Sequence, residues 1–89
     1  MTLYSSKKYD KEYKRLPLNL QKQADQKIDL FVLYGPTYPS LRFKIYQKHK
    51  AQRFFELSFT KGYRVILQQI AGDEYMLLRI GSHDLLNRL

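Results

Sequence analysis

Two histidines and a group of basic residues are the side chains of this 89-residue sequence best suited to chemistry. Imidazole has an ordinary pKa of about 6.5, so His49 and His83 could each give or take a proton near neutral pH. Arg64 alternates with Tyr63 and Val65, which indicates a strand, and a guanidinium fixed on a strand can hold two phosphate oxygens at once. These residue types would suit proton transfer beside an anion.

Basic residues are concentrated in the middle of the sequence. The chain has 16 Lys and Arg against 8 Asp and Glu, a formal net charge of +8, which favours a polyanionic or acidic partner. Residues 35–55 contain no acid and five bases: Arg42, Lys44, Lys48, Lys50 and Arg53. Aromatic residues are interleaved with them, as in surfaces that stack nucleobases and neutralise phosphates, although a solvated basic loop would have the same composition.

Composition excludes several classes of protein. The sequence has no cysteine, and two histidines are too few for a structural zinc site, so we expect neither metal nor cofactor and a reducing, cytoplasmic setting. The longest apolar run, residues 30–34, is much shorter than the roughly 20 residues of a membrane span. A chain of this length forms one core, and we expect a single domain over residues 1–89.

Apolar periodicity near 3.6 predicts two helices in the first part of the chain. After a short strand at residues 2–4, Ser5 or Ser6 could cap a helix that carries Tyr9, Tyr13 and Leu16 on one face. Pro17 ends this helix and can open a second one, which runs to Gly35-Pro36. Its apolar stripe consists of Leu20, Ala24, Ile28 and Phe31. The two helices should form an antiparallel hairpin.

The period then changes to about 2, which predicts strands. A strand over residues 41–46 has an apolar and a basic face, and strands over 54–59, 63–70 and 75–80 follow with short turns between them as a meander. Helices grouped before strands favour an α+β fold. We predict an N-terminal helical hairpin packed on one face of a twisted antiparallel sheet, in the order β-α-α-β-β-β.

Short stretches along nearly the whole chain resemble the RelE/ParE superfamily of toxins from type II toxin–antitoxin systems. They are Ser6-Lys7-Lys8-Tyr9, Leu16-Pro17 with Leu20-Gln21, Pro39-Ser40-Leu41-Arg42, Phe55-Glu56-Leu57, Gly62-Tyr63-Arg64-Val65 and Leu77 to Asp84. The closing Gly81-Ser82-His83 is most similar to the YafQ-like branch. The RelE-like fold that the resemblance implies agrees with the order of elements predicted above.

The resemblance implies a ribosome-dependent mRNA endoribonuclease that inhibits translation. Its partners would be the ribosome, mRNA and an acidic antitoxin, in a toxin–antitoxin complex that is a higher-order heteromer. A ParE-like toxin would instead poison DNA gyrase without cutting RNA, because members with this fold differ in target. A third alternative is a basic domain that binds nucleic acid without catalysis.

Metal-independent RNA cleavage needs a base for the ribose 2′-OH, cations for the phosphorane and an acid for the leaving oxygen. The resemblance assigns proton transfer to His83 and phosphate stabilisation to Arg64, although Arg64 could instead form an ion pair with Glu56. Asp84 could orient His83, act as a proton acceptor, or belong to the first turn of a C-terminal helix. His49 could be a second proton-transfer group or a solvated loop residue.

Further bases are candidates for substrate contacts. Arg42, Lys44, Lys48 and Lys50 belong to the predicted basic strand and loop, and Arg79 lies on the last predicted strand. Whether Arg79 shares a face with Arg64 depends on a register that the sequence does not reveal. Some ribonucleases of this superfamily have an aromatic residue after the last strand. Residues 85–89 contain none, so Tyr46 or Tyr63 would have to replace it if the chain is one of them.

Overall fold

The computed structural model describes residues 1–45 and 53–87, which form a five-stranded sheet with helices on both sides. The elements are β1 (Thr2–Ser5), α1 (Lys7–Arg15), α2 (Leu18–Tyr34), the 3-10 turn η1 (Pro39–Leu41), β2 (Lys44–Ile45), β3 (Phe54–Thr60), β4 (Tyr63–Ala71), β5 (Glu74–Ser82) and α3 (His83–Asn87).

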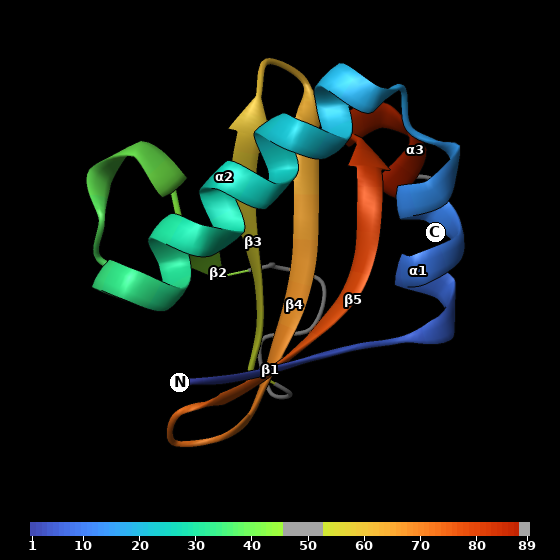
Figure 1. The fold of residues 1–89 in the computed structure, drawn as a ribbon. Helices are drawn as coiled ribbons and strands as arrows, with labels where there is room; N and C mark the ends of the chain where they lie inside the picture. The colour runs from blue at the N-terminus through green and yellow to red at the C-terminus, as the bar shows by residue number, and fades with distance from the viewer. Residues whose placement is uncertain (46–52, 88–89) are drawn as a thin grey trace.

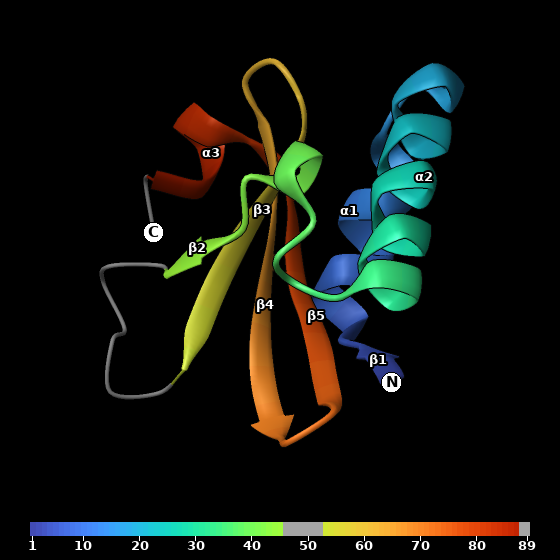
Figure 2. The ribbon, with the colours of Figure 1, turned by 90° about the vertical axis from the view of Figure 1, so that its left-hand side faces the viewer.

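The strand order in the sheet is β1-β5-β4-β3-β2 (Figure 1). Strands β3, β4 and β5 form the predicted antiparallel meander, whereas β1 pairs with β5 in parallel. Figure 2 shows α1 and α2 on one side of the sheet and α3 on the other. The predicted α+β fold with an N-terminal helical hairpin is confirmed. The pairing of β1 makes the sheet mixed rather than purely antiparallel.

The helical hairpin begins and packs as the apolar pattern predicts. Ser6 is the cap of α1: its Oγ accepts the backbone N–H of Tyr9 at 3.0 Å and donates to the Leu78 carbonyl at 2.9 Å. Tyr9 is buried, and this burial raises the pKa of its phenol. Ala24 and Phe31 on α2 are fully buried against the sheet. The two predicted apolar stripes therefore form the helix side of the core.

Gly35 ends α2 in a conformation that other residues rarely adopt. Its φ is +83° and its ψ is −178°, and its amide donates to the Phe31 carbonyl at 2.9 Å. This region of backbone space is populated almost only by glycine, because a Cβ would clash with the neighbouring backbone.

Gly35→Ala is expected to lower the free energy of unfolding by about 1–3 kcal/mol, the usual cost of this backbone region for other residues. Apart from the two adjoining residues, a Cβ at Gly35 meets no atom within 4 Å. The loss of stability would therefore come from the backbone conformation alone. Gly72→Ala is the matched control, because it also meets nothing and has no positive φ. Urea unfolding of the two variants measures the difference, and equal stabilities would contradict this account.

The predicted strand over residues 41–46 is largely wrong. Residues 39–41 form η1, and only Lys44 and Ile45 pair with β3. Leu41 is fully buried through this turn, and Arg42 follows it in the left-handed region with φ +49° and ψ +42°. A left-handed residue cannot continue a strand, so the alternation of apolar and basic residues did not produce one here. Residue 46 lies outside the described residues.

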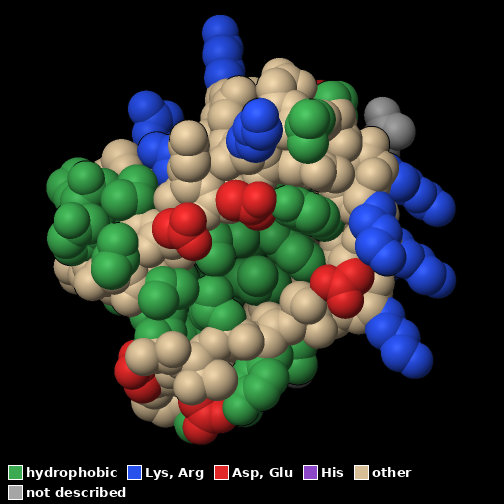
Figure 3. All heavy atoms as spheres, in the orientation of Figure 1, with side chains coloured by type: hydrophobic (Ala, Val, Ile, Leu, Met, Phe, Trp, Pro, Cys, Tyr) green, Lys and Arg blue, Asp and Glu red, His purple; other side chains and the backbone are tan. Residues whose placement is uncertain are grey.

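The surface has separate apolar and basic regions. Figure 3 shows hydrophobic side chains gathered beside the end of α2, where Val32, Leu33 and Tyr34 are 42%, 71% and 60% exposed. Basic side chains project from the opposite side of this view, where α1 lies. Across residues 1–45 and 53–87, no helix has the length and apolar character needed to cross a membrane.

Candidate anion-binding and catalytic site

A hollow of about 640 Å³ lies at the end of the sheet where the β3–β4 turn meets η1. Its described lining residues include four bases and no acid: Lys27, Ser40, Arg42, Ser58, Phe59, Thr60, Lys61, Gly62 and Arg64. Four positive charges around one opening create a potential that favours an anion. We call this hollow the cationic pocket.

The shortness of β2 leaves room for the cationic pocket. Strand β2 pairs with β3 only at Glu56 and Phe55, so within the described chain the end of β3 has no strand beyond it. The η1 turn packs against both β3 and α2 there, as Figure 2 illustrates. The Lys27 Nζ of α2 donates to the Ser40 carbonyl at 3.3 Å. A helix, a turn and a hairpin thus each contribute a base to one opening.

Arg64 is the most firmly held base of the cationic pocket. It lies opposite Ser58 on β3, its side chain is 20% exposed, and its Nη1 donates to the Tyr63 carbonyl at 2.9 Å. Its buried Nε has no hydrogen-bond partner among the described residues. Arg64 therefore presents a guanidinium held in place by the Tyr63 carbonyl among the residues that line the cationic pocket.

Glu56 lies next to Arg64, but Lys44 is its closer partner. Glu56 is buried at 6% exposure, and its Oε1 is 3.2 Å from Lys44 Nζ and 3.9 Å from Arg64 Nε. The alternative ion pair of Arg64 with Glu56 is therefore present as a loose contact without a hydrogen bond. Lys44 is not among the residues that line the cationic pocket and offsets the charge of the buried carboxylate.

His83 and Asp84 begin α3 beside the turn that borders the cationic pocket. The His83 backbone N–H donates to the Gly62 carbonyl at 2.6 Å, and Tyr63 pairs with Ser82. Both side chains are exposed, and neither lines the cationic pocket. Asp84 lies in the first turn of α3, where a carboxylate stabilises the N-terminus of a helix.

Several predicted site residues are not described by the structure. Lys48, His49 and Lys50, together with Tyr46, lie outside the described residues. In the part of the chain that the structure describes, no three His, Cys, Asp or Glu side chains are grouped as metal ligands would be.

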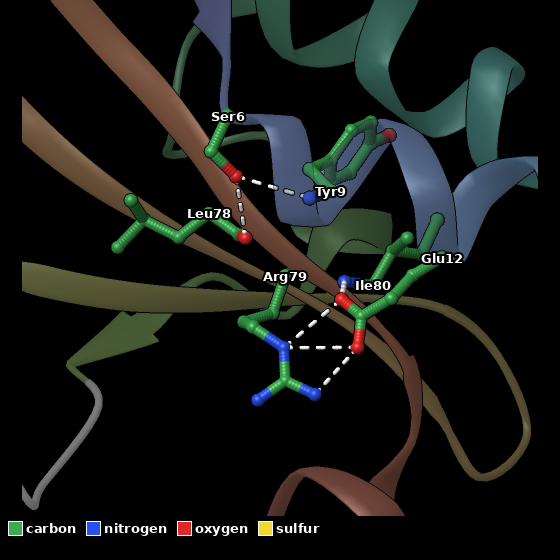
Figure 4. A network of polar contacts seen from close by, with 6 residues as sticks. All are labelled: Ser6, Tyr9, Glu12, Leu78, Arg79 and Ile80. Atoms are coloured by element: carbon green, nitrogen blue, oxygen red, sulfur yellow. Dashed lines mark hydrogen bonds and ion pairs between the residues drawn. The ribbon is translucent and has the colours of Figure 1, made fainter.

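Arg79 is held by α1, away from the cationic pocket (Figure 4). Its Nε donates to both carboxylate oxygens of Glu12 at 2.9 Å, and its Nη2 donates to Oε2. Glu12 Oε1 also accepts the Ile80 backbone N–H at 3.2 Å. The Glu12 and Arg79 side chains are only 14% and 13% exposed. This bidentate pair joins α1 to β5 and occupies the guanidinium that the sequence offered as a substrate contact.

Arg79→Lys is expected to lower the free energy of unfolding by about 1–3 kcal/mol, because an ammonium cannot reproduce the planar fork on Glu12. Lys11→Gln replaces an exposed base on α1, the helix that carries Glu12. This variant is the control and should change stability by less than about 0.5 kcal/mol. Urea unfolding provides the measurement. Unchanged stability with weakened RNA binding would instead assign Arg79 to the substrate.

The sequence did not reveal two bases of the cationic pocket, Lys27 and Lys61. Lys27 lies within the helical pattern of α2, where an exposed lysine is ordinary, and Lys61 lies in a tight turn. The docking of α2 and η1 against the β3–β4 turn brings Lys27 to Arg64, whereas Lys61 precedes Arg64 by only three residues. Only the contribution of Lys27 had no local sequence signal.

Comparison with known proteins places the architecture among toxins. No family model matches the sequence, and no curated protein matches it. Among solved structures, a copper-bound mutant toxin from Helicobacter pylori is 24% identical, with 97% of this chain and 98% of that chain covered and a TM-score of 0.75. Toxin–antitoxin complexes are also similar. RelB-RelE from Methanococcus jannaschii has 14% identity, 96% and 95% coverage and a TM-score of 0.75.

A further similar structure is the DinJ-YafQ toxin–antitoxin complex of E. coli, at 14% identity, 94% and 93% coverage and a TM-score of 0.78. At such identities a structural match establishes the fold. The chain has the fold of the RelE/YafQ-like toxins over nearly its whole length. The fold-level resemblance detected in the sequence is therefore confirmed.

Proposed function

We propose that this chain is the toxin of a type II toxin–antitoxin system and that it cleaves mRNA on the ribosome. The observation that carries the proposal is the acid-free cationic pocket around Arg64, in a chain with the RelE/YafQ-like toxin fold. The fold by itself leaves the target open, because one fold serves several functions. A pocket of four bases beside a histidine is suited to a phosphodiester.

The reaction would proceed through the ribose 2′-OH. A base removes the 2′ proton, the 2′ oxygen forms a bond to phosphorus, and the bond from phosphorus to the 5′ oxygen breaks as that oxygen takes a proton. The products are a 2′,3′-cyclic phosphate and a 5′-hydroxyl end. We assign one of the two proton transfers to His83.

The cationic pocket would stabilise the phosphorane. Arg64 has its guanidinium held by the Tyr63 carbonyl and lines the cationic pocket. Such a preorganised donor loses little entropy when charge develops on the phosphate oxygens. Arg42, Lys27 and Lys61 would add positive potential around the same phosphate. Because Lys44 offsets Glu56, the buried carboxylate repels the substrate less.

An acidic antitoxin is the partner that this charge distribution favours. The chain has a net charge of +8, and the RelE and YafQ structures cited above contain their antitoxins. A disordered acidic segment could order on the basic surface and block it. We propose a higher-order heteromer with the antitoxin, and the ribosome with its mRNA as the target.

Expression in a bacterial host followed by mapping of mRNA 5′ ends tests the proposed function. Cuts in register with codons within translated regions are expected. Growth arrest with intact mRNA and induction of the DNA-damage response would instead identify a gyrase poison. Binding of nucleic acid without growth arrest would leave only a non-catalytic binding domain.

A further inference from the structure

A second hollow adjoins the cationic pocket and shares Arg42 with it. It has a volume of about 560 Å³ and is built entirely from the segment that joins α2 to β2. Its lining residues are Pro36, Thr37, Tyr38, Pro39, Arg42 and Phe43. The lining is mostly aromatic and proline, with one cation at the boundary to the cationic pocket. We call it the aromatic hollow.

Ring stacking holds the walls of the aromatic hollow. Tyr38 stacks on Tyr34 with centroids 4.8 Å apart and planes at 17°. Phe43 stacks between Phe31, at 5.5 Å and 13°, and Phe55, at 4.9 Å and 27°. Phe31 is fully buried, so Phe43 is anchored to the core. Tyr38, which is held by the single ring of Tyr34, can accept another flat ring at little cost in side-chain entropy.

Arg42 is positioned between the two hollows by an unusual backbone. It has φ +49°, and its amide donates to the Pro39 carbonyl at 3.3 Å. The left-handed region is unfavourable for a residue with a Cβ, and such strain is common at binding sites. The Arg42 side chain is exposed and lines both hollows.

We propose that the aromatic hollow is a nucleobase subsite of the RNA site. With a phosphate in the cationic pocket between Arg42 and Arg64, the base of the adjoining nucleotide stacks in the aromatic hollow against Tyr38. This inference rests on the proposed function, because it takes the cationic pocket to hold an RNA phosphate. Each RNA nucleotide combines a phosphate with a flat aromatic base, which is the combination that adjoining cationic and aromatic hollows accept.

A binding experiment tests the subsite without cleavage. The probe is a short RNA with 2′-O-methyl groups, which block attack by the 2′ oxygen, and with one 2-aminopurine whose fluorescence falls on stacking. Binding to the parent chain is expected to quench the probe. A matched oligonucleotide that is abasic at this position should bind about tenfold more weakly, since stacking on an aromatic contributes about 1–3 kcal/mol.

Three variants locate the stacking ring. Tyr38→Leu should remove the quenching and lose the preference for the base over the abasic probe, whereas Tyr38→Phe should keep both. Tyr4→Leu, an exposed tyrosine on β1, is the control and should behave like the parent. If Tyr38→Leu does not fold, Tyr34→Ala gives a second reading, because Tyr34 is 60% exposed and supports Tyr38 from the other side.

The outcomes separate the subsite from the proposed function. Equal affinity of the parent for the base-containing and abasic probes would overturn the subsite while leaving the cationic pocket intact. A parent that binds neither probe at low salt would also overturn the subsite, whereas mapping of mRNA ends decides the ribonuclease separately. Loss of antitoxin binding in Tyr38→Leu with unchanged RNA binding would show that a protein, and not a base, occupies the hollow.

Discussion

Arg64→Ala is expected to lower the rate of mRNA cleavage by about two orders of magnitude or more, the usual loss when a preorganised donor to a transition-state oxyanion is removed. Arg64 is a largely buried base of the cationic pocket, with 20% of its side chain exposed and its guanidinium held by the Tyr63 carbonyl. The fold should persist, because Glu56 keeps its closer partner Lys44 at 3.2 Å. Primer extension on ribosome-bound mRNA gives the rate, and circular dichroism checks folding.

Two further variants make this prediction specific. Arg64→Lys keeps the charge but not the planar fork, so it should recover only part of the lost activity. Lys61→Ala removes an exposed base from the same pocket and should mainly weaken binding, in a way that higher salt reproduces. If Arg64→Ala and Lys61→Ala lost activity equally, general positive charge and not a fixed guanidinium would explain the pocket.

His83→Ala is expected to abolish growth arrest together with mRNA cleavage, because the imidazole is the proposed proton-transfer group. The backbone of His83 bonds to Gly62, a lining residue of the cationic pocket. A loss of about two to four orders of magnitude is typical of a missing acid–base residue. The side chain is exposed, and alanine retains the backbone N–H of His83 that donates to the Gly62 carbonyl. Circular dichroism checks that the variant folds. Growth curves and protein levels measured together give the result.

Asp84→Asn is the matched variant at the next position. If Asp84 only stabilises the first turn of α3, the asparagine variant should keep most of the activity, whereas a residue that orients His83 would lose most of it. A double variant of His83 and Arg64 should be little worse than the poorer single variant, since both act on one transition state. Full toxicity of His83→Ala at normal protein levels would exclude proton transfer at His83 and favour the gyrase alternative.

The helical hairpin and the meander could be predicted from the sequence because local patterns determine them. Ser6, the apolar stripe of α2 and Gly35 each act within a few residues of their own position. The alternation along β3, β4 and β5 likewise reports which side chains face the core, and Leu57, Val65 and Leu67 are indeed fully buried. The basic residues around Arg42 also indicated an anionic partner before any contact was known.

The site itself depended on contacts between distant segments. Residues 39–41 form the η1 turn, in which Leu41 is buried, so the predicted strand at residues 41–46 is reduced to Lys44 and Ile45 among the described residues, and the end of β3 is left open. Arg79 and Arg64 look alike in sequence, but Arg79 is held by Glu12 of α1, 67 residues away, and Arg64 borders the cationic pocket. Lys27 joins that pocket from α2 without any local signal.

The sequence by itself determined which elements form and the sign of the charge they carry, because these follow from neighbouring residues. Only the tertiary structure decided which of those charges are already paired and which share one opening, because ion pairs and pockets form between elements that the chain brings together only when it folds.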